Sequence, residues 1–401
     1  MAKEISRRSF LKTGTTAAVG LAMAPGMMAK KKKKTEDTAP LNRKLKILAV
    51  GVGGRGASVL RGLETEEIIG MCDVDWKYAM PIFERYPNAK RYNDYKVMFA
   101  ELLDEADAVM VATADHTHAI IAAEAIVAGK HVYVEKPLSL NFSEGAELVA
   151  IAKEKGLLIG CAPDTFLGAG IQTCRQIIDL GIIGQVTGCT AFMTCHGHES
   201  WHPDPEFYYK KGGGPMFDMG PYYLTALVNL LGPVEFVAGM TSMATPTRTI
   251  TSQPKNGTVI DVEVPTHVNG LLRFENGAVG SILTSFDVWG STLPRIEVYG
   301  TRGAMIVPDP NGFDGPVLVK QAFDADFKPW PVMTQDSVNS RGIGLSDMAD
   351  RILNGRESHR ASGDIALHVL EIMEAFHVSS DEKTQVKLTS TCQRPEKMPI
   401  V

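Results

Sequence analysis

The chain has 401 residues, of which 44% are hydrophobic and 22% are charged, which is typical of a globular protein with room for two domains. No uncharged apolar run reaches the roughly 18 residues of a membrane-spanning helix, which excludes a polytopic membrane protein and argues against stable membrane insertion. Removing the +3 of residues 1–29 and the +5 of the lysine run 30–34 from the net charge of −5 leaves about −13 for residues 35–401. A body this acidic is not expected to bind nucleic acid.

Residues 1–29 resemble a twin-arginine export signal. Arg7 and Arg8 stand in Ser-Arg-Arg-Ser-Phe-Leu-Lys, and a weakly apolar stretch that ends in small residues follows. A disordered basic tail is the alternative interpretation. Ala24 and Ala29 are both candidate cleavage points, and residues 30–43 are expected to be a solvated linker. The signal predicts a periplasmic protein, and because this route carries folded proteins, it also favours a cofactor bound before export.

Alternating strand and helix patterns fill residues 44–162. Strands are expected at 44–50, 68–72, 108–112, 131–134 and 157–161, and helices at 57–63, 95–104, 117–128 and 143–155. Units of this length need right-handed crossovers, so the strands form a parallel sheet. The fold class is therefore α/β, with a doubly wound Rossmann sheet as the first domain.

A glycine motif lies between the first strand and the first helix. Its G-x-G-x-x-G pattern comprises Gly51, Gly53, Gly54, Arg55 and Gly56. Asp73 ends the next strand 22 residues after Gly51, where a carboxylate can accept hydrogen bonds from the adenosine ribose hydroxyls. We therefore expect NAD as the cofactor. Arg55 and Lys77 leave NADP as an alternative, because either could bind a 2′-phosphate.

Two later segments carry a resemblance to a known family. Residues 111–118 read Val-Ala-Thr-Ala-Asp-His-Thr-His, and residues 129–137 read Gly-Lys-His-Val-Tyr-Val-Glu-Lys-Pro. After a Rossmann-type start, this combination resembles the glucose–fructose oxidoreductase, inositol dehydrogenase and rhizopine-catabolism (Gfo/Idh/MocA) family over residues 44–390. The resemblance implies an NAD(P)-dependent oxidoreductase. It also implies a second α/β domain, residues 163–395, whose open, largely antiparallel sheet supports homo-oligomers.

The resemblance assigns roles near the cofactor. Lys136 corresponds to the lysine of the E-K-P motif beside the nicotinamide, where it would assist removal of a hydroxyl proton if burial or a neighbouring charge lowers its pKa. Glu135 is expected to contact the nicotinamide ribose or this lysine. His118 matches a family histidine or, alternatively, begins a helix. Thr113 and Asp115 complete the predicted cofactor-binding residues.

In the second domain, the chain departs from the family at one position. A helix is expected to follow Gly214 and to end before Gly232. Asp218 matches a family aspartate that lies in the substrate site, but Tyr222 stands where the family has a histidine four residues later. Tyr222 is therefore predicted to be catalytic, together with Lys136 and Asp218. A replacement histidine is sought in residues 196–202 or at His267.

Residues 196–214 have the composition of a ligand-binding loop, with three histidines within seven residues and several aromatic side chains. Imidazoles and carboxylates bind hydroxyls and aromatic faces stack on sugar rings, so the predicted substrate is a sugar, glycoside or cyclitol. The predicted substrate-binding residues are Asp164, His196, His198, Trp201, His202 and His267. A packing loop is the alternative. A cation on the three histidines is a further alternative, but we predict no metal.

The remaining patterns complete the second domain. Strands are expected at 185–195, 267–274, 278–286, 295–299 and 305–307, and helices at 345–354 and 363–377. Residues 309–340 are expected to be variable surface. The six cysteines show no C-x-x-C pair and no zinc spacing, so we expect free thiols.

These observations leave three hypotheses for function. The first is an exported enzyme with retained NAD that moves a hydride to or from a secondary hydroxyl of a carbohydrate or cyclitol. The second is a retained-NAD glycosidase or lyase, which oxidises a sugar carbon, eliminates the aglycone and returns the hydride. The third is a non-catalytic sugar- or nucleotide-binding module, which Lys136, Asp218 and the glycine motif argue against.

Overall fold

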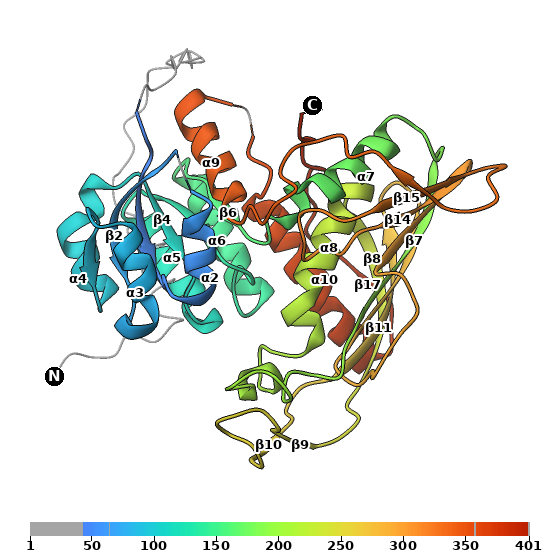
Figure 1. Cartoon of the computed structure of the whole chain (residues 1–401), viewed down its shortest axis with the longest axis horizontal. Coiled ribbons are helices and arrows are strands. Elements are labelled where there is room, and N and C mark those ends of the chain that lie inside the picture. Colours follow the sequence, from blue (N-terminus) through green and yellow to red (C-terminus); the bar gives the residue numbers. More distant parts are fainter. Residues whose placement is uncertain (1–42, 64, 357, 400–401) are drawn as a thin grey trace, which may run out of the picture.

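The first part of the computed structural model is a six-stranded parallel sheet with helices on both faces (Figure 1). The structure describes residues 43–63, 65–356 and 358–399. The strands lie in the order β3-β2-β1-β4-β5-β6. Their bounds are β1 Lys46–Val50, β2 Glu67–Cys72, β3 Lys90–Tyr92, β4 Ala108–Val111, β5 His131–Val134 and β6 Ile159–Cys161. This order confirms the predicted Rossmann topology.

Two apolar clusters hold the helices of this domain against opposite faces of its sheet, because alternate strand residues point to opposite sides. The helices are α2 Gly54–Arg61, α3 Trp76–Arg85, α4 Tyr95–Leu102, α5 His118–Val127 and α6 Phe142–Glu154. Ile47 and Ala49 of β1 pack with α2 and α3, whereas Leu48 and Val50 pack with α4, α5 and α6. The carboxyl ends of β1, β4 and β5 consequently meet at one edge, where the candidate residues follow.

The second part is a nine-stranded sheet that is antiparallel except where β7 and β12 run parallel. Its order is β16-β15-β14-β13-β7-β12-β11-β8-β17. The bounds are β7 Val186–Thr194, β8 Val234–Ser242, β11 His267–Phe274, β12 Val279–Ser285, β13 Ile296–Gly300, β14 Gly303–Val307, β15 Val317–Gln321, β16 Lys328–Trp330 and β17 Val386–Lys387. The open, largely antiparallel sheet is thereby confirmed. The strands β15 and β16 correct the expectation that residues 309–340 are only variable surface.

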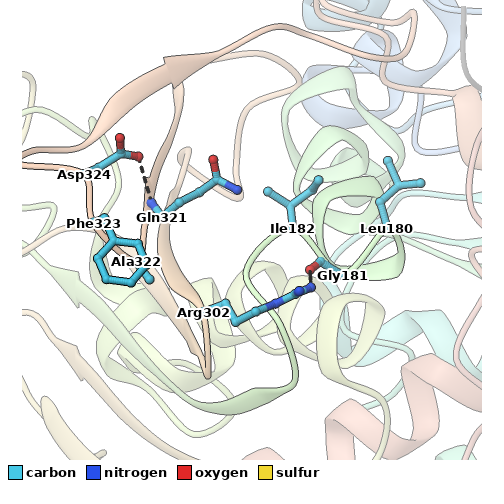
Figure 2. Close-up of a pocket in the computed structure, with 8 residues that line it drawn as sticks. All are labelled: Leu180, Gly181, Ile182, Arg302, Gln321, Ala322, Phe323 and Asp324. Carbon is cyan, nitrogen blue, oxygen red and sulfur yellow. Dashed lines mark hydrogen bonds between the residues drawn. The ribbon is translucent and has the colours of Figure 1, made fainter.

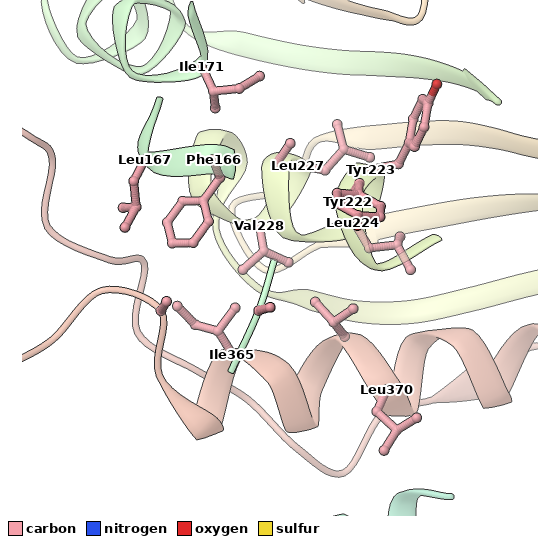
Figure 3. Close-up of a cluster of buried hydrophobic side chains, with 14 of the residues drawn as sticks. Phe166, Leu167, Ile171, Tyr222, Tyr223, Leu224, Leu227, Val228, Ile365 and Leu370 are labelled. Carbon is pink, nitrogen blue, oxygen red and sulfur yellow. The ribbon is translucent and has the colours of Figure 1, made fainter. Parts of the chain in front are cut away.

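Three helices pack on one face of the nine-stranded sheet: α7 Ala169–Asp179, α8 Pro215–Leu231 and α10 Gly363–Glu382. Figure 3 shows the core between them, with Phe166 and Ile171 near Val228 of α8 and Ile365 of α10. A two-stranded hairpin, β9 Thr247–Thr249 and β10 Val259–Asp261, projects at the far end of this part (Figure 1). This hairpin was not expected from the sequence.

The helix α9, Ile343–Asn354, lies beside the first sheet although it follows β16 of the second (Figure 1). Its Leu345 and Met348 are buried in the same cluster as Tyr133 of β5, and Gly160 of β6 forms a bridge with Ser362. The chain therefore returns to the Rossmann sheet before it adds β17, the last strand of the second sheet.

Two sequence-level expectations concern other parts of the chain. All six cysteines are free, as expected. No helix among the described residues has the length and apolar character needed to cross a membrane. The predicted export signal, residues 1–29, lies outside the described residues.

Candidate active site

The glycine motif forms a backbone turn that admits no side chain. Gly51 has a φ of +78°, and a Cβ there would lie 2.5 Å from the carbonyl oxygen of Ala112. A Cβ on Gly56 would overlap the Gly51 carbonyl oxygen. The helix α2 begins directly after Gly53, so its first amide groups face this turn. Such a cradle fits the pyrophosphate of a dinucleotide.

Asp73 lies at the edge of the same turn. Its Oδ2 accepts hydrogen bonds from the amides of Val52 and Gly53, each at 2.8 Å, and its Oδ1 accepts one from the Asp75 amide at 2.9 Å. The ring of Tyr78 packs against Gly53, where a Cβ would lie 2.6 Å from Tyr78 Cδ1. The structure thus brings the predicted ribose ligand to the glycine motif.

His118 connects the segments that follow β4 and β5. It is 1% exposed, and its ring nitrogens lie 2.8 Å from the carbonyl oxygen of Pro137 and 3.0 Å from that of Thr113. His118 is also the first residue of α5, so the helix-start alternative is confirmed. Its contacts therefore join the predicted cofactor-binding Thr113 to the E-K-P motif, next to Lys136.

Lys136 and Asp218 form an ion pair between the two parts of the chain. Lys136 Nζ lies 3.1 Å from Asp218 Oδ1 and donates a hydrogen bond to the Asp218 carbonyl oxygen at 2.9 Å. The two side chains are 17% and 16% exposed. The carboxylate of Glu135 accepts instead from the backbone amide of Lys136, at 3.2 Å. Lys136 therefore joins the Rossmann motif to α8.

Lys136 and Asp218 each stabilise the ionised form of the other. Burial by itself lowers the pKa of Lys136, but the Asp218 carboxylate and Tyr222 outweigh burial and raise this pKa above its ordinary value. Burial by itself raises the pKa of Asp218, but Lys136 and His198 lower it by more. Lys136 therefore keeps its proton and Asp218 stays ionised near neutral pH. The lowered lysine pKa on which the predicted role depended is not what the structure shows.

His198 lies on the other oxygen of Asp218. Its Nε2 is 3.5 Å from Asp218 Oδ2, while its Nδ1 is buried without a partner among the described residues. The imidazole stacks on Tyr208, with ring centroids 3.7 Å apart, and meets Phe286 edge-on at 4.6 Å. These two rings and the carboxylate thus orient Nε2 toward the ion pair. Of the two places where a replacement histidine was sought, the structure brings residues 196–202 to Asp218.

The other predicted histidines have different neighbours. His196 stacks on Trp289 with centroids 3.4 Å apart, and His202 lies 5.4 Å from Phe207. His267 Nδ1 is 2.9 Å from Ser285 Oγ, on β12. Among the described residues, no three His, Cys, Asp or Glu side chains are arranged to hold a metal ion.

A buried network fixes the backbone on either side of His198. Tyr209 donates a hydrogen bond to Glu199, and its hydroxyl accepts one from the His198 amide at 3.2 Å. Arg248 of β9 binds Glu199 Oε1 at 2.6 Å and also binds Asp287 and the Phe286 carbonyl oxygen. Burial raises the pKa of Glu199, but Tyr209 and Arg248 lower it by more, so this carboxylate stays charged.

Asp164 does not join these residues. It is 3% exposed, and its Oδ2 accepts hydrogen bonds from the amides of Gly342 and Gly344, at 2.7 and 3.2 Å. These amides belong to the start of α9, where the first turn leaves N–H groups without helical partners. The structure therefore shows Asp164 binding the start of α9, and its role as a substrate ligand stays a prediction.

Tyr222 is 3% exposed on α8, one turn after Asp218. Its ring faces two cations, with Lys136 Nζ 5.9 Å and Arg341 Cζ 5.8 Å from the centroid. Cation–π contact of this kind stabilises a charged lysine. Tyr222 thus lies in the site, but the structure shows its ring face rather than a hydrogen-bonded phenol. Its predicted catalytic role stays a prediction.

Several residues that build the site were not predicted from the sequence. Glu199 stands inside the histidine-rich loop, and Tyr208 among its aromatic residues, so composition drew attention to both without separating them from their neighbours. Arg248, Phe286 and Asp287 lie 40 or more residues after Tyr208 and carry no motif. Only the tertiary structure brings them to the loop around His198.

A separate hollow lies at the other end of the nine-stranded sheet and contains none of the predicted site residues. It has a volume of about 590 Å³ and is lined by Leu180, Gly181, Ile182, Arg302, Gln321, Ala322, Phe323 and Asp324 (Figure 2). Phe323 in its wall is fully exposed.

The comparisons with known proteins agree with this geometry. The model for the oxidoreductase family with an NAD-binding Rossmann fold matches residues 45–162, and that of the GFO/IDH/MocA C-terminal domain matches residues 171–306. An uncharacterised oxidoreductase of Schizosaccharomyces pombe is 24% identical over 76% of this chain and 86% of its own length. The D-glucoside 3-dehydrogenase of Escherichia coli is 27% identical over 60% and 70%.

The fold matches that of solved structures over most of the chain. The aldose–aldose oxidoreductase of Caulobacter crescentus has a TM-score of 0.71 at 24% identity, covering 86% of this chain and 100% of that one. The chain spans 55%, 58% and 56% of three other curated relatives that it matches. The two matched family models cover both parts of the fold that meet at Lys136 and Asp218. The chain therefore belongs to the GFO/IDH/MocA family of oxidoreductases and has an NAD-binding Rossmann domain.

Proposed function

We propose that the protein oxidises or reduces a secondary alcohol carbon of a sugar, glycoside or cyclitol, with NAD as the hydride carrier. The observation that carries the proposal is the arrangement of Lys136 and His198 on the two oxygens of Asp218. This arrangement places a cation and an imidazole together at the carboxyl end of β5. The glycine motif and Asp73 lie at the corresponding edge of the same sheet.

The side chains have separate tasks in this proposal. NAD, when bound, supplies the acceptor for the hydrogen that leaves carbon with its electron pair. Lys136 keeps its proton because its pKa is raised, so it donates a hydrogen bond to the substrate oxygen and stabilises negative charge there. His198 is the proposed acceptor of the hydroxyl proton, and the Asp218 carboxylate, 3.5 Å from Nε2, stabilises the imidazolium that forms. Asp218 stays ionised and orients both groups.

The substrate class rests on the site composition and on relatives. Aromatic and imidazole rings surround His198, and the matched Escherichia coli relative bears the name D-glucoside 3-dehydrogenase. A secondary hydroxyl on a ring suits both observations. The dehydrogenase is the function that the geometry supports best, because Lys136, Asp218 and His198 supply a proton donor, an orienting anion and a proton acceptor.

We also propose that the protein is exported to the periplasm as a homo-oligomer and retains its cofactor. The support is the twin-arginine signature in residues 1–29, the glycine cradle, and the family's use of the open sheet face. A retained cofactor has to be reoxidised in place by a second carbohydrate. A solved structure of this fold, the Caulobacter crescentus enzyme, bears the name aldose–aldose oxidoreductase.

The test compares two histidines by turnover. His198→Gln is expected to lower kcat by a factor of about 10² or more with NAD affinity unchanged, because glutamine keeps a polar side chain but cannot exchange the proton. His267→Gln is expected to change kcat by less than about twofold, since His267 contacts Ser285 rather than Asp218. Loss of activity in His267→Gln with full activity in His198→Gln would overturn the assignment of the base. Unaltered kcat in Lys136→Met would overturn the dehydrogenase site as a whole.

A further inference from the structure

Exposed aromatic side chains gather next to His198. Trp201 is 61% exposed and Phe207 is 54% exposed, although large aromatic residues gain most from burial. His202 lies between them, with ring centroids 5.4 Å from each. We call Trp201, His202 and Phe207 the aromatic shelf. Clustered exposed apolar groups mark a binding surface more often than scattered ones do.

The aromatic shelf lies directly beside His198, the proposed proton acceptor. The Trp201 centroid lies 5.3 Å from that of His198. Phe207 lies 4.0 Å from Tyr208, which in turn stacks on His198 at 3.7 Å. The shelf therefore continues directly outward from the imidazole that faces Asp218. A molecule whose carbon reacts beside His198 would place its next substituent over these rings.

Charged groups border the shelf on its outer side. Lys255 binds Glu206 at 2.6 Å and also pairs with Asp204, and the Asp204 amide donates to His202 Nδ1 at 3.0 Å. Ser252 donates to the His202 carbonyl oxygen at 2.5 Å. An apolar platform with hydrogen-bonding groups at its rim matches a sugar ring, which has apolar C–H faces and a hydroxyl edge.

The shelf is held in place before any ligand arrives. Its loop is tied to β9 through Glu199 and Arg248, and the Glu199 carbonyl oxygen accepts from the amides of Thr251 and Ser252 at 2.9 and 3.0 Å. Trp201 and His202 also donate backbone hydrogen bonds to the His198 carbonyl oxygen. A preorganised platform binds without the cost of ordering a loop.

We propose that the preferred substrate carries a second ring, linked to the ring that reacts, and that this second ring stacks on Trp201 and Phe207. The substrate is thus a disaccharide or an aryl glycoside rather than a free monosaccharide or cyclitol. This inference rests on the proposed function, because it places the reacting ring between Lys136 and His198. The second sugar of a disaccharide and the aromatic ring of an aryl glycoside both have an apolar face. The kinetic comparison of substrates distinguishes between them.

The experiment measures kcat and KM of the full-length protein with NAD for three matched substrates: methyl β-glucoside, phenyl β-glucoside and cellobiose. The expected KM for at least one two-ring substrate is about tenfold below that of the methyl glycoside, with similar kcat. A lower KM for phenyl β-glucoside alone assigns the shelf to an aromatic aglycone, and one for cellobiose alone assigns it to a sugar. Equal KM values for all three overturn the inference.

Two variants test whether the lower KM of two-ring substrates depends on the aromatic shelf. Trp201→Ala is expected to raise the KM of the preferred two-ring substrate about tenfold more than it raises that of methyl β-glucoside. The control is Phe323→Ala, since Phe323 is a fully exposed aromatic residue at the distant hollow (Figure 2), and no kinetic change is expected. An equal loss for one-ring and two-ring substrates in Trp201→Ala overturns the inference, because it would show a general effect through His198.

A binding measurement separates this inference from the proposed function. If no substrate is turned over, calorimetric titration of the NAD-loaded protein with phenyl β-glucoside and cellobiose still tests the shelf. Binding that weakens about tenfold in Trp201→Ala, and not in Phe323→Ala, supports the shelf while the proposed reaction fails. Absence of binding to both two-ring ligands overturns the shelf.

Discussion

At the scale of single residues, the site depends on one carboxylate between a lysine ammonium and an imidazole. Asp218 is almost enclosed, yet its pKa is lowered because Lys136 and His198 outweigh the effect of burial. An ionised group in such a place is stable only while its partners remain charged or hydrogen-bonded. Removing the carboxylate would leave the Lys136 ammonium buried beside Tyr222 with its backbone acceptor alone.

This arrangement predicts a pH-dependent loss of stability in Asp218→Asn. A carboxylate whose folded pKa is lowered stabilises the fold above its unfolded pKa, and this contribution is lost as pH falls through the folded value. We expect urea unfolding at pH 7 to show a loss of about 3 kcal/mol in the free energy of unfolding. At pH values below the ordinary carboxylate range, about 4, the difference from the unmodified protein is expected to shrink.

The control is Asp309→Asn. Asp309 pairs with Arg295 at 3.7 Å, but both side chains are about half exposed, so solvent screens the pair. A change below about 0.5 kcal/mol is expected at either pH. A loss in Asp218→Asn that is equally large in acid would show that packing, and not charge, is responsible.

At the scale of elements, the loop after β7 and the strand β9 act as one unit. Gly197 has a φ of +75°, and a Cβ there would overlap Glu199 Oε2 and the Tyr209 hydroxyl and lie 2.8 Å from Arg248 Nη1. No side chain fits at this point of the network. The backbone on either side of His198 is therefore set by a glycine and by an arginine 51 residues later.

The prediction for this unit compares two glycines with the same backbone requirement. Gly197→Ala is expected to displace Glu199 and Tyr209 and to lower kcat by about tenfold or more, with NAD affinity unchanged. Gly257→Ala is the matched control: its φ is +90°, but a Cβ there has nothing within 4 Å. Both pay the cost of a left-handed residue, about 1 kcal/mol, which thermal unfolding measures. Equal kinetics in the two variants would contradict the positioning role of the network.

At the scale of the whole molecule, the site is built from residues of both parts of the chain. Lys136 comes from the end of β5, Asp218 from α8 and His198 from the loop after β7. The return of α9 to the first sheet, held by Asp164, adds a second connection between the parts. The glycine motif and Lys136 therefore come from one part of the chain, and Asp218 and His198 from the other.

The prediction at this scale concerns redox balance. An exported enzyme has no assured exchange with a cytoplasmic NAD pool, so the proposed retained cofactor has to be reduced and oxidised in place. Protein purified from its export compartment, denatured and analysed by mass spectrometry, is expected to release NAD. With a mixture of glycosides, chromatography is expected to show products while absorbance at 340 nm stays nearly constant. Products that form only in step with added NAD would contradict the closed cycle, and release of aglycone would instead favour the glycosidase or lyase hypothesis.

Most local features of the first domain follow from its sequence alone. Except for β3, which reads Lys-Arg-Tyr and was not predicted, its strands are short apolar runs. The glycine motif and Asp73 lie close along the chain, so local pattern predicts both sheet and cofactor cradle. The match of Lys136 and Asp218 to family motifs also singled out two of the three side chains that the structure brings together. The strands β15 and β16 and the hairpin β9–β10 were not predicted because each strand is only three to five residues long, with Pro and Gly nearby.

The tertiary structure was needed to show which histidine lies beside Asp218. It also shows that Asp164, a predicted substrate ligand, binds the start of α9. Three histidines in a seven-residue loop are equivalent by composition, and His198 is distinguished by the stack on Tyr208, the edge of Phe286 and the anchoring of Glu199 by Arg248. Asp164 follows a Rossmann strand like a site residue, but α9 returns from 178 residues away to bind it. The sign of the Lys136 pKa change depends on the distance to Asp218. These are contacts between distant segments, whose energies depend on geometry that no local pattern contains.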